Sequence, residues 1–198
     1  MKKPVIIIAG VIGLIIVGTV GWYLASPLFI DNVVDEEFPL EVPSPEELAQ
    51  MPAEEMEKVE AKVMETAAEM PDKVMDEPMP EASDSPTIAV QGQFQDADDF
   101  HKGSGSATIY QLPGGRHVLR FENFSATNGP DLHVLLSKHP APANRDEVGA
   151  DYIDLGSLKG NVGNQNYDIP AGVDISEYQS VVIYCMPFHV VFATATLG

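Results

Sequence analysis

The chain has 198 residues, which is enough for one folded domain together with segments that stand outside it. Its 30 acidic residues outnumber its 11 Lys and Arg residues, so the formal net charge at pH 7 is −19. A chain this acidic repels phosphate backbones, and it has no cluster of basic residues with interleaved aromatics, so we expect no nucleic-acid partner. Because Cys185 is the only cysteine, no intramolecular disulfide can form and the fold depends on its hydrophobic core.

Residues 1–30 predict a cytoplasmic basic start followed by a transmembrane anchor. Residues 4–30 contain no charged side chain, and about 20 apolar residues are enough for a helix to cross the hydrocarbon core. Lys2 and Lys3 precede this run, and the positive-inside rule then holds the N-terminus in the cytoplasm. The sequence therefore predicts a single-pass membrane protein whose remaining residues are extracytoplasmic, either periplasmic or at the cell surface.

The alternative interpretation of this segment is a cleaved signal peptide, because a basic start and an apolar run are common to both. The best cleavage site, Leu24-Ala25-Ser26, has Leu at the outer position that needs a small residue, and Pro27 follows it directly. Trp22 and Tyr23 stand at the far end of the run, where amphipathic aromatic rings favour the headgroup region. An uncleaved anchor fits these residues better.

Residues 31–87 predict an acidic stalk or linker. Phe38 is the only aromatic residue within residues 31–87, and such a segment buries too little apolar area to offset its ordering entropy. Ser44, followed by Pro45 and Glu47, is typical of a helix start. From residue 53 to residue 70 the apolar side chains recur at spacings of three and four, which predicts an amphipathic helix. We expect a partly helical spacer; the alternative is a helix that docks on a partner through its Met-rich face.

Residues 88–198 predict an all-β domain. Short runs rich in Val, Ile, Phe and Tyr are separated by Gly, Pro, Asn and Asp, and helical periodicity is absent. Many short strands at near-regular spacing are typical of a β-sandwich, here jelly-roll-like with about eight strands, or of a closely related barrel. The last two runs are apolar on both faces, so we expect them to be central strands. The predicted strands are 88–94, 105–111, 116–123, 131–137, 151–155, 164–169, 180–186 and 189–197.

The segment from Gly160 to Gly163, with Asn161, Asn164 and Gln165, is interpreted as a turn held by side-chain amides, because Asn tolerates left-handed geometry and can bond its own backbone. Lys159 precedes it, but the strand, glycine loop and helix of a phosphate-binding loop are missing from the pattern. The sequence favours a structural role for this segment over ligand binding.

Several motifs together give residues 88–198 a family resemblance. They are Asn123-Phe124, Gly129-Pro130-Asp131-Leu132, the segment Leu155-Gly156-x-Leu158-Lys159-Gly160-Asn161-x-Gly163-Asn164-Gln165-x-Tyr167-x-Ile169-Pro170, Tyr178, and Val181 to Leu197 with Tyr184-Cys185. With these motifs the chain resembles the DM-thirteen domain family, which is related to the DOMON domains. The resemblance implies an all-β extracytoplasmic module that transfers electrons through its characteristic cysteine, which here would be Cys185.

The candidate site is the turn between the last two strands, which holds Cys185 and, four residues later, His189. Three interpretations stay open. A structural cysteine would pack as a small hydrophobe, because strand alternation places Val181, Ile183 and Cys185 on one face. A redox thiol would need exposure and a lowered pKa, with His189 favouring the thiolate.

The third interpretation of this turn is a metal site. Cys-x-Pro-x-His resembles the last ligand loop of cupredoxins, and His133 is a candidate upstream ligand beside Cys185 and His189. Soft sulfur with two imidazoles suits copper, and haem is the other group considered. The axial Met that usually follows the second His in cupredoxins is missing here. His101, His117 and His139 stand beside basic residues in polar contexts and are interpreted as surface residues.

The expected function is a membrane-anchored extracytoplasmic β domain with an electron-transfer or redox-sensing role through Cys185. The alternatives are a non-catalytic ligand-binding or adhesion module with a structural cysteine, and a cupredoxin-like copper site. Neither a Gly-x-Ser-x-Gly nor a His-Glu-x-x-His motif occurs, so the sequence gives no reason to expect an enzyme. It requires no cofactor. The expected partners are the membrane, through residues 4–30, and an unidentified redox or protein partner.

Overall fold

The computed structural model describes residues 43–80 and 86–198 of the chain. Within these two ranges, no helix is long and apolar enough to cross a membrane. The predicted transmembrane anchor in residues 4–30 lies outside the described residues, and so do the basic start and the first part of the predicted stalk.

Within residues 43–80, two helices precede the sheet. α2 (Pro45–Gln50) begins after Ser44, whose hydroxyl accepts a hydrogen bond from the backbone N of Glu47, while the Glu47 carboxylate accepts one from the backbone N of Ser44. This reciprocal pair is a capping box, and it confirms the predicted helix start. α3 (Ala53–Ala68) follows and agrees with the predicted amphipathic helix.

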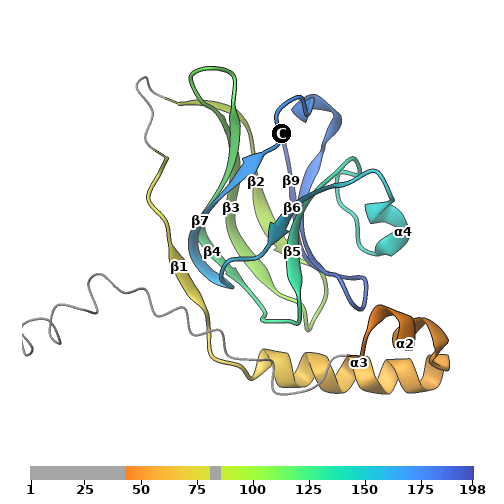
Figure 1. Cartoon of the computed structure of the whole chain (residues 1–198). Helices are drawn as coiled ribbons and strands as arrows, with labels where there is room; N and C mark the ends of the chain where they lie inside the picture. The colour runs from red at the N-terminus through yellow and green to blue at the C-terminus, as the bar shows by residue number, and fades with distance from the viewer. Residues whose placement is uncertain (1–42, 81–85) are drawn as a thin grey trace, which may run out of the picture. The chain divides into compact units, whose positions relative to one another are not determined.

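In the described residues, nine strands form one continuous sheet in the order β1-β7-β4-β3-β2-β9-β8-β5-β6 (Figure 1). All eight predicted strands are present, with their ends shifted by a few residues, and β1 is an additional strand from the predicted stalk. β1 runs parallel to β7, whereas the other neighbouring strands are antiparallel. The strands are β1 (Val74–Asp76), β2 (Thr87–Asp96), β3 (Gly103–Gln111), β4 (His117–Ala126), β5 (Leu132–Ser137), β6 (Ile153–Ser157), β7 (Val162–Ile169), β8 (Ser180–Cys185) and β9 (Val190–Thr196).

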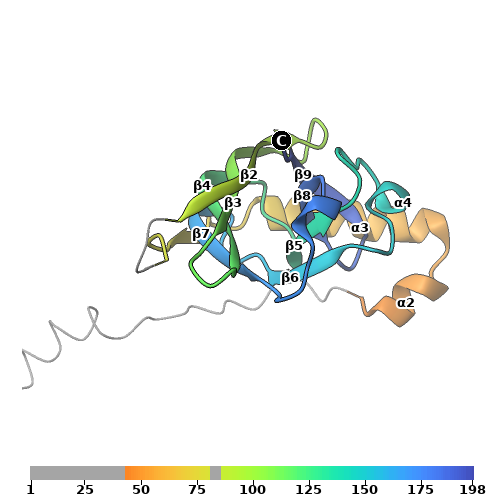
Figure 2. The same ribbon diagram turned by 90° about the horizontal axis from the view of Figure 1, so that it is seen from above.

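Strand β2 joins the two halves of the sheet. Residues 87–93 pair with β3 and residues 94–96 pair with β9. A side chain on Gly92, at this change of partner, would overlap the backbone carbonyl of Thr196, so glycine permits the close approach. The sheet curls on itself into a half-barrel around one core (Figure 2). The predicted all-β class is therefore confirmed. Because β2 belongs to both halves, the strands form one curled sheet, which is nearer to the barrel alternative than to a sandwich of two separate sheets.

The inner face of the curled sheet carries the main core. Phe94 meets Phe121 and Phe124 edge-on, with ring centroids 4.9 and 5.0 Å apart. Burying one such side chain stabilises the fold by about 1.5–3 kcal/mol. Ile183 and Cys185 of β8 are buried in the same core, so the predicted alternation along this strand is confirmed.

The outer face of β8 is buried as well. Val182 and Tyr184 pack there with Val148 of α4 (Arg145–Val148), a short helix that begins after Asn144. A single 3₁₀ turn, Ile175–Glu177, precedes β8. Because both faces of β8 are covered and its two edges pair with β5 and β9, the prediction that the last two strands are central is confirmed.

Helix α3 packs against the β domain rather than standing free in solvent. Val63, Met64 and Ala67 are buried, and Met64 belongs to the same core cluster as the phenylalanines. Met56, on the same helix, is exposed. Both views show α3 lying across one end of the curled sheet (Figures 1 and 2). The sequence favours a solvated spacer for this segment, whereas in the structure the apolar side of α3 is packed against the β domain.

Candidate functional site

Cys185 lies at the end of the central strand β8 and is completely buried. Its thiol donates a hydrogen bond to the carbonyl oxygen of Pro130, with a sulfur-to-oxygen distance of 3.2 Å. Leu132 of β5 and Val190 of β9 are its partners on the two neighbouring strands. The thiol is therefore enclosed by apolar side chains and one backbone acceptor.

The surroundings of Cys185 favour the protonated thiol. Burial raises the pKa of the Cys185 thiol to about 12, and a backbone hydrogen bond from Phe188 opposes the rise. The negative charges of Asp131 and Glu60 add to it. Since the thiolate is the nucleophile in cysteine chemistry, the thiol in this conformation is unreactive at neutral pH.

His133 lies on the opposite face of the sheet from Cys185. The register pairs Leu132 with Cys185 and His133 with Tyr184, and consecutive residues of a strand point to opposite faces. Both ring nitrogens of His133 have partners: Nδ1 lies 2.8 Å from the carboxylate of Asp154, and Nε2 lies 3.2 Å from that of Asp131. The imidazole is held by carboxylates and faces away from the thiol.

His189 lies in the turn between β8 and β9, with a left-handed backbone angle φ of 59°. Its ring centroid is 6.1 Å from that of Tyr184, which belongs to the outer cluster. Burial lowers the pKa of His189, and the positive charge of Arg145 adds to this effect. A neutral imidazole supplies no cation to stabilise a thiolate.

The three residues predicted as a metal site are thus not brought together as a ligand set. Cys185 faces the inner core, while His133 faces outward and His189 packs near an outward-facing tyrosine. Across residues 43–80 and 86–198, no group of three His, Cys, Asp or Glu side chains is arranged to hold a metal ion.

His101 is buried, so the prediction that it is a surface residue is wrong. Its Nδ1 lies 2.7 Å from Asp98, and its ring packs on Phe192 with the centroids 4.3 Å apart. Its Nε2 is buried and has no hydrogen-bond partner among the residues the structure describes. The contact between His101 and Asp98 could be predicted from their spacing of three residues. The contact between His101 and Phe192 could not, because the two residues are far apart in the chain.

Glu60 of α3 connects His101 electrostatically with the thiol. Burial raises the pKa of the Glu60 carboxyl, and its interaction with His101 opposes that rise. The same carboxylate is among the charges that raise the pKa of Cys185. The charge of Glu60 therefore acts on the thiol, and Met64 of the same helix belongs to the core cluster that contains Cys185.

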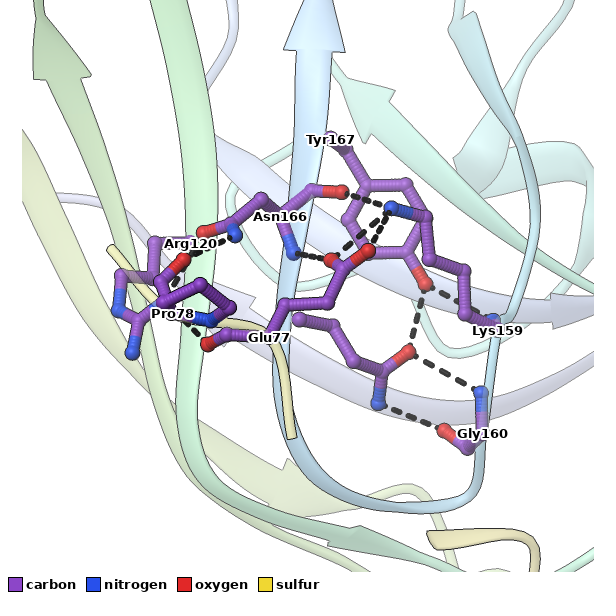
Figure 3. A network of polar contacts seen from close by, with 8 residues as sticks. Glu77, Pro78, Arg120, Lys159, Gly160, Asn166 and Tyr167 are labelled. Atoms are coloured by element: carbon purple, nitrogen blue, oxygen red, sulfur yellow. Dashed lines mark hydrogen bonds and ion pairs between the residues drawn. The ribbon is translucent and has the colours of Figure 1, made fainter. Parts of the chain in front are cut away.

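A second polar site lies at β7, the neighbour of the edge strand β1, where the loop that precedes β7 is fixed by buried amides (Figure 3). The side chain of Gln165 is completely buried, and its amide both donates to the carbonyl of Gly160 at 2.7 Å and accepts from the backbone N of Gly160 at 3.2 Å. The Tyr167 hydroxyl donates to Gln165 at 2.8 Å and accepts from the backbone N of Lys159 at 3.0 Å. Burial raises the pKa of Tyr167 well above its usual value, so this donor stays protonated.

This loop positions Lys159 to bind Glu77 of the segment that contains β1 (Figure 3). The ammonium of Lys159 lies 2.8 and 2.9 Å from the two carboxylate oxygens of Glu77 and donates to the carbonyl of Asn166 at 2.7 Å. The backbone N of Asn166 donates to the same carboxylate at 2.7 Å, and its side-chain amide donates to the carbonyl of Pro78 at 2.8 Å. Arg120 of β4 donates to the Glu77 carbonyl at 3.1 Å.

Asparagines hold the rest of the segment. Asn161 accepts from the backbone N of Lys73 and donates to the Asp72 carboxylate, both at 2.7 Å. Asn164 donates to the Asp76 carboxylate at 2.9 Å. The predicted amide-stabilised turn thus binds residues 72–78, which are 82 to 89 positions away in sequence for these side-chain contacts. Only the unusual density of Gly and Asn in the loop signals this role in the sequence.

The chain matches a known protein family. A family model described as Electron transfer DM13 matches residues 93–197, which is more than half of the chain. The matched range includes Cys185 and the whole loop from Lys159 to Tyr167, but not the segment 72–78 that the loop binds. No curated protein and no solved structure matches.

Proposed function

The chain belongs to the DM13 electron-transfer family, and from this premise we propose that it is a membrane-tethered extracytoplasmic module with a redox role through Cys185. The observation that carries the proposal is the place of the only thiol. Cys185 lies within the matched residues, at the end of β8, where the negative charge of Glu60 on α3 acts on its thiol. Met64 of the same helix belongs to the core cluster that contains Cys185. A helix can move away from such an end without breaking the strand pairing of the sheet.

The proposed chemistry is thiol–disulfide exchange with a partner disulfide. After α3 moves, the Cys185 thiol loses its proton, and its sulfur attacks one sulfur of the partner. The new sulfur–sulfur bond forms as the partner's bond breaks, and the leaving thiolate of the partner takes up a proton. The partner disulfide is the electron acceptor, so the step needs no further oxidant.

Alkylation of Cys185 in the full chain, held in detergent or a lipid disc, tests whether α3 controls the thiol. Met64→Glu places a charge at a buried position and should detach the helix, whereas Met56→Glu changes an exposed position of the same helix. Lowering the free energy needed to expose the thiol by about 1.4 kcal/mol accelerates alkylation about tenfold. We therefore expect at least a tenfold acceleration for Met64→Glu and no change in rate for Met56→Glu.

Oxidised glutathione serves as the disulfide probe in the same samples. The Met64→Glu chain should form a mixed disulfide that mass spectrometry detects, and the same chain with Cys185→Ser should not. If the Met64→Glu chain reacts no faster than the wild type with either reagent, the redox proposal fails.

The alternative function is a non-catalytic binding module with a structural cysteine. The observation in its favour is the complete burial of Cys185 together with the rise of its pKa to about 12. This alternative predicts that the thiol resists both reagents until the whole domain unfolds, in the wild type and in both Met variants.

The membrane tether is proposed from the sequence of residues 1–30. Protease added outside intact cells or spheroplasts should remove the β domain, because Lys2 and Lys3 keep the N-terminus in the cytoplasm. Protection of the domain from external protease would contradict the proposed topology.

A further inference from the structure

We propose that the edge of β7 is a peptide-binding site of the strand-addition type, selective for an extended acidic segment, and that residues 72–78 occupy it as a built-in ligand. The site is independent of the redox proposal, because it lies along β7, beside β1, rather than at Cys185. Most of its lining residues lie between Lys159 and Tyr167, in a segment that also carries the family resemblance, and Arg120 of β4 adds a further contact.

The backbone of the ligand is recognised as an added strand. β1 pairs in parallel with β7, and Val74, Met75 and Asp76 stand beside Val162, Gly163 and Asn164. Beyond the strand, the backbone N of Glu77 donates to the carbonyl of Asn164 at 2.9 Å. Strand addition to a free sheet edge is a general mode of peptide recognition.

Two glycines provide the space for the ligand backbone. A side chain on Gly160 would overlap the carbonyl oxygen of Lys73, and one on Gly163 would overlap that of Met75. The loop is therefore shaped to admit a peptide backbone at these two positions, which a turn that only reverses the chain does not require.

Charge selects the ligand side chains. Lys159 binds both carboxylate oxygens of Glu77, and the amides of Asn161 and Asn164 donate to the carboxylates of Asp72 and Asp76. The side chains of Lys159 and Glu77 are 37% and 29% exposed, so solvent only partly screens their ion pair. A peptide with carboxylates at these three places therefore fits, and one with a cation opposite Lys159 does not.

The empty site would hold donors in need of an acceptor. Of the hydrogen bonds described for the Lys159 ammonium, only that to Asn166 would remain without Glu77. Arg120 has a buried side chain and would lose its contact with the Glu77 carbonyl. Leaving such groups unpaired is costly, so the site should capture an equivalent peptide supplied by another molecule.

The test uses the full chain and a fluorescent peptide of residues 70–80. Glu77→Lys should expel the built-in strand, because it sets two cations against each other. The Glu77→Lys chain should then bind the peptide at least about tenfold more tightly than the wild type, since one lost charged hydrogen bond is worth about 1.5–3 kcal/mol. Glu177→Lys, which disrupts the exposed pair between Lys138 and Glu177, is the control and should bind as weakly as the wild type.

The double variant Glu77→Lys with Lys159→Glu exchanges the two charges, so the built-in strand can pair again. This variant should lose the affinity for the peptide. Hydrogen exchange at residues 74–76 reports whether the strand has left, and Glu77→Gln replaces Glu77→Lys if the latter misfolds. The proposal is overturned if the released chain does not bind the peptide, if a scrambled peptide binds equally well, or if Glu77→Lys leaves residues 74–76 protected and the affinity unchanged.

Discussion

Gly163→Ala tests directly whether residues 72–78 belong to the folded domain. Gly163 has a backbone angle φ of +108°, and an alanine held at such an angle costs about 1–3 kcal/mol. The added Cβ would also overlap the carbonyl oxygen of Met75, which is backbone of β1 and cannot swing aside as a side chain can. The variant must therefore either push β1 away from β7 or distort β7 itself.

Gly156→Ala is the matched control. Gly156 has a nearly equal φ of +102°, but nothing lies within 4 Å of the Cβ position. Both variants carry the cost of the positive angle, and only Gly163→Ala also loses the contacts of the Glu77 carboxylate. Since a hydrogen bond to a charged group contributes about 1.5–3 kcal/mol, we expect Gly163→Ala to be the more destabilising by about that amount.

Denaturant unfolding of the full chain measures the two free energies, and hydrogen exchange locates the change. Residues 74–76 should exchange much faster in Gly163→Ala and at the wild-type rate in Gly156→Ala. Equal destabilisation by the two variants, with β1 protected in both, would refute the assignment of this segment to the sheet.

Three further predictions concern the buried polar groups. Cys185→Ser should lower the free energy of unfolding by about 1–3 kcal/mol, because it places a more strongly hydrated hydroxyl in the core, and urea titration will measure the loss. Because the pKa of Cys185 is raised to about 12 in the folded state, the stability contributed by the protonated thiol is fully present below the unfolded pKa of about 8.5. That contribution should decline as the pH rises from there through about 12, so the stability difference between wild type and Cys185→Ser should shrink over this range; a constant difference would contradict the raised pKa. Gln165→Leu removes the hydrogen-bond partner of buried groups on Gly160 and Tyr167, and each group left unpaired should lower the free energy of unfolding by about 1–3 kcal/mol. An unchanged free energy of unfolding would show that water replaces the amide.

The sequence by itself determined the local features of this protein. Short apolar runs between turn residues located all eight predicted strands, and strand alternation placed Ile183 and Cys185 on one buried face. Ser44 and Glu47 marked the start of α2, and the spacing of apolar residues marked α3. These signals are readable because strand alternation, helical periodicity and capping each involve residues within a few positions of one another.

Only the tertiary structure decided which faces and edges meet. Strand alternation predicts which residues of one strand share a face, but it does not relate the faces of two different strands. The pairing of β5 with β8 places His133 and Cys185 on opposite faces of the sheet. The acidic segment around Glu77 has no local tendency to form a strand, and it becomes β1 because Lys159 and the asparagines of a loop more than 80 residues away bind it. The composition of residues 72–78 alone cannot predict this pairing, because the strand is stabilised only by contacts with the distant segment.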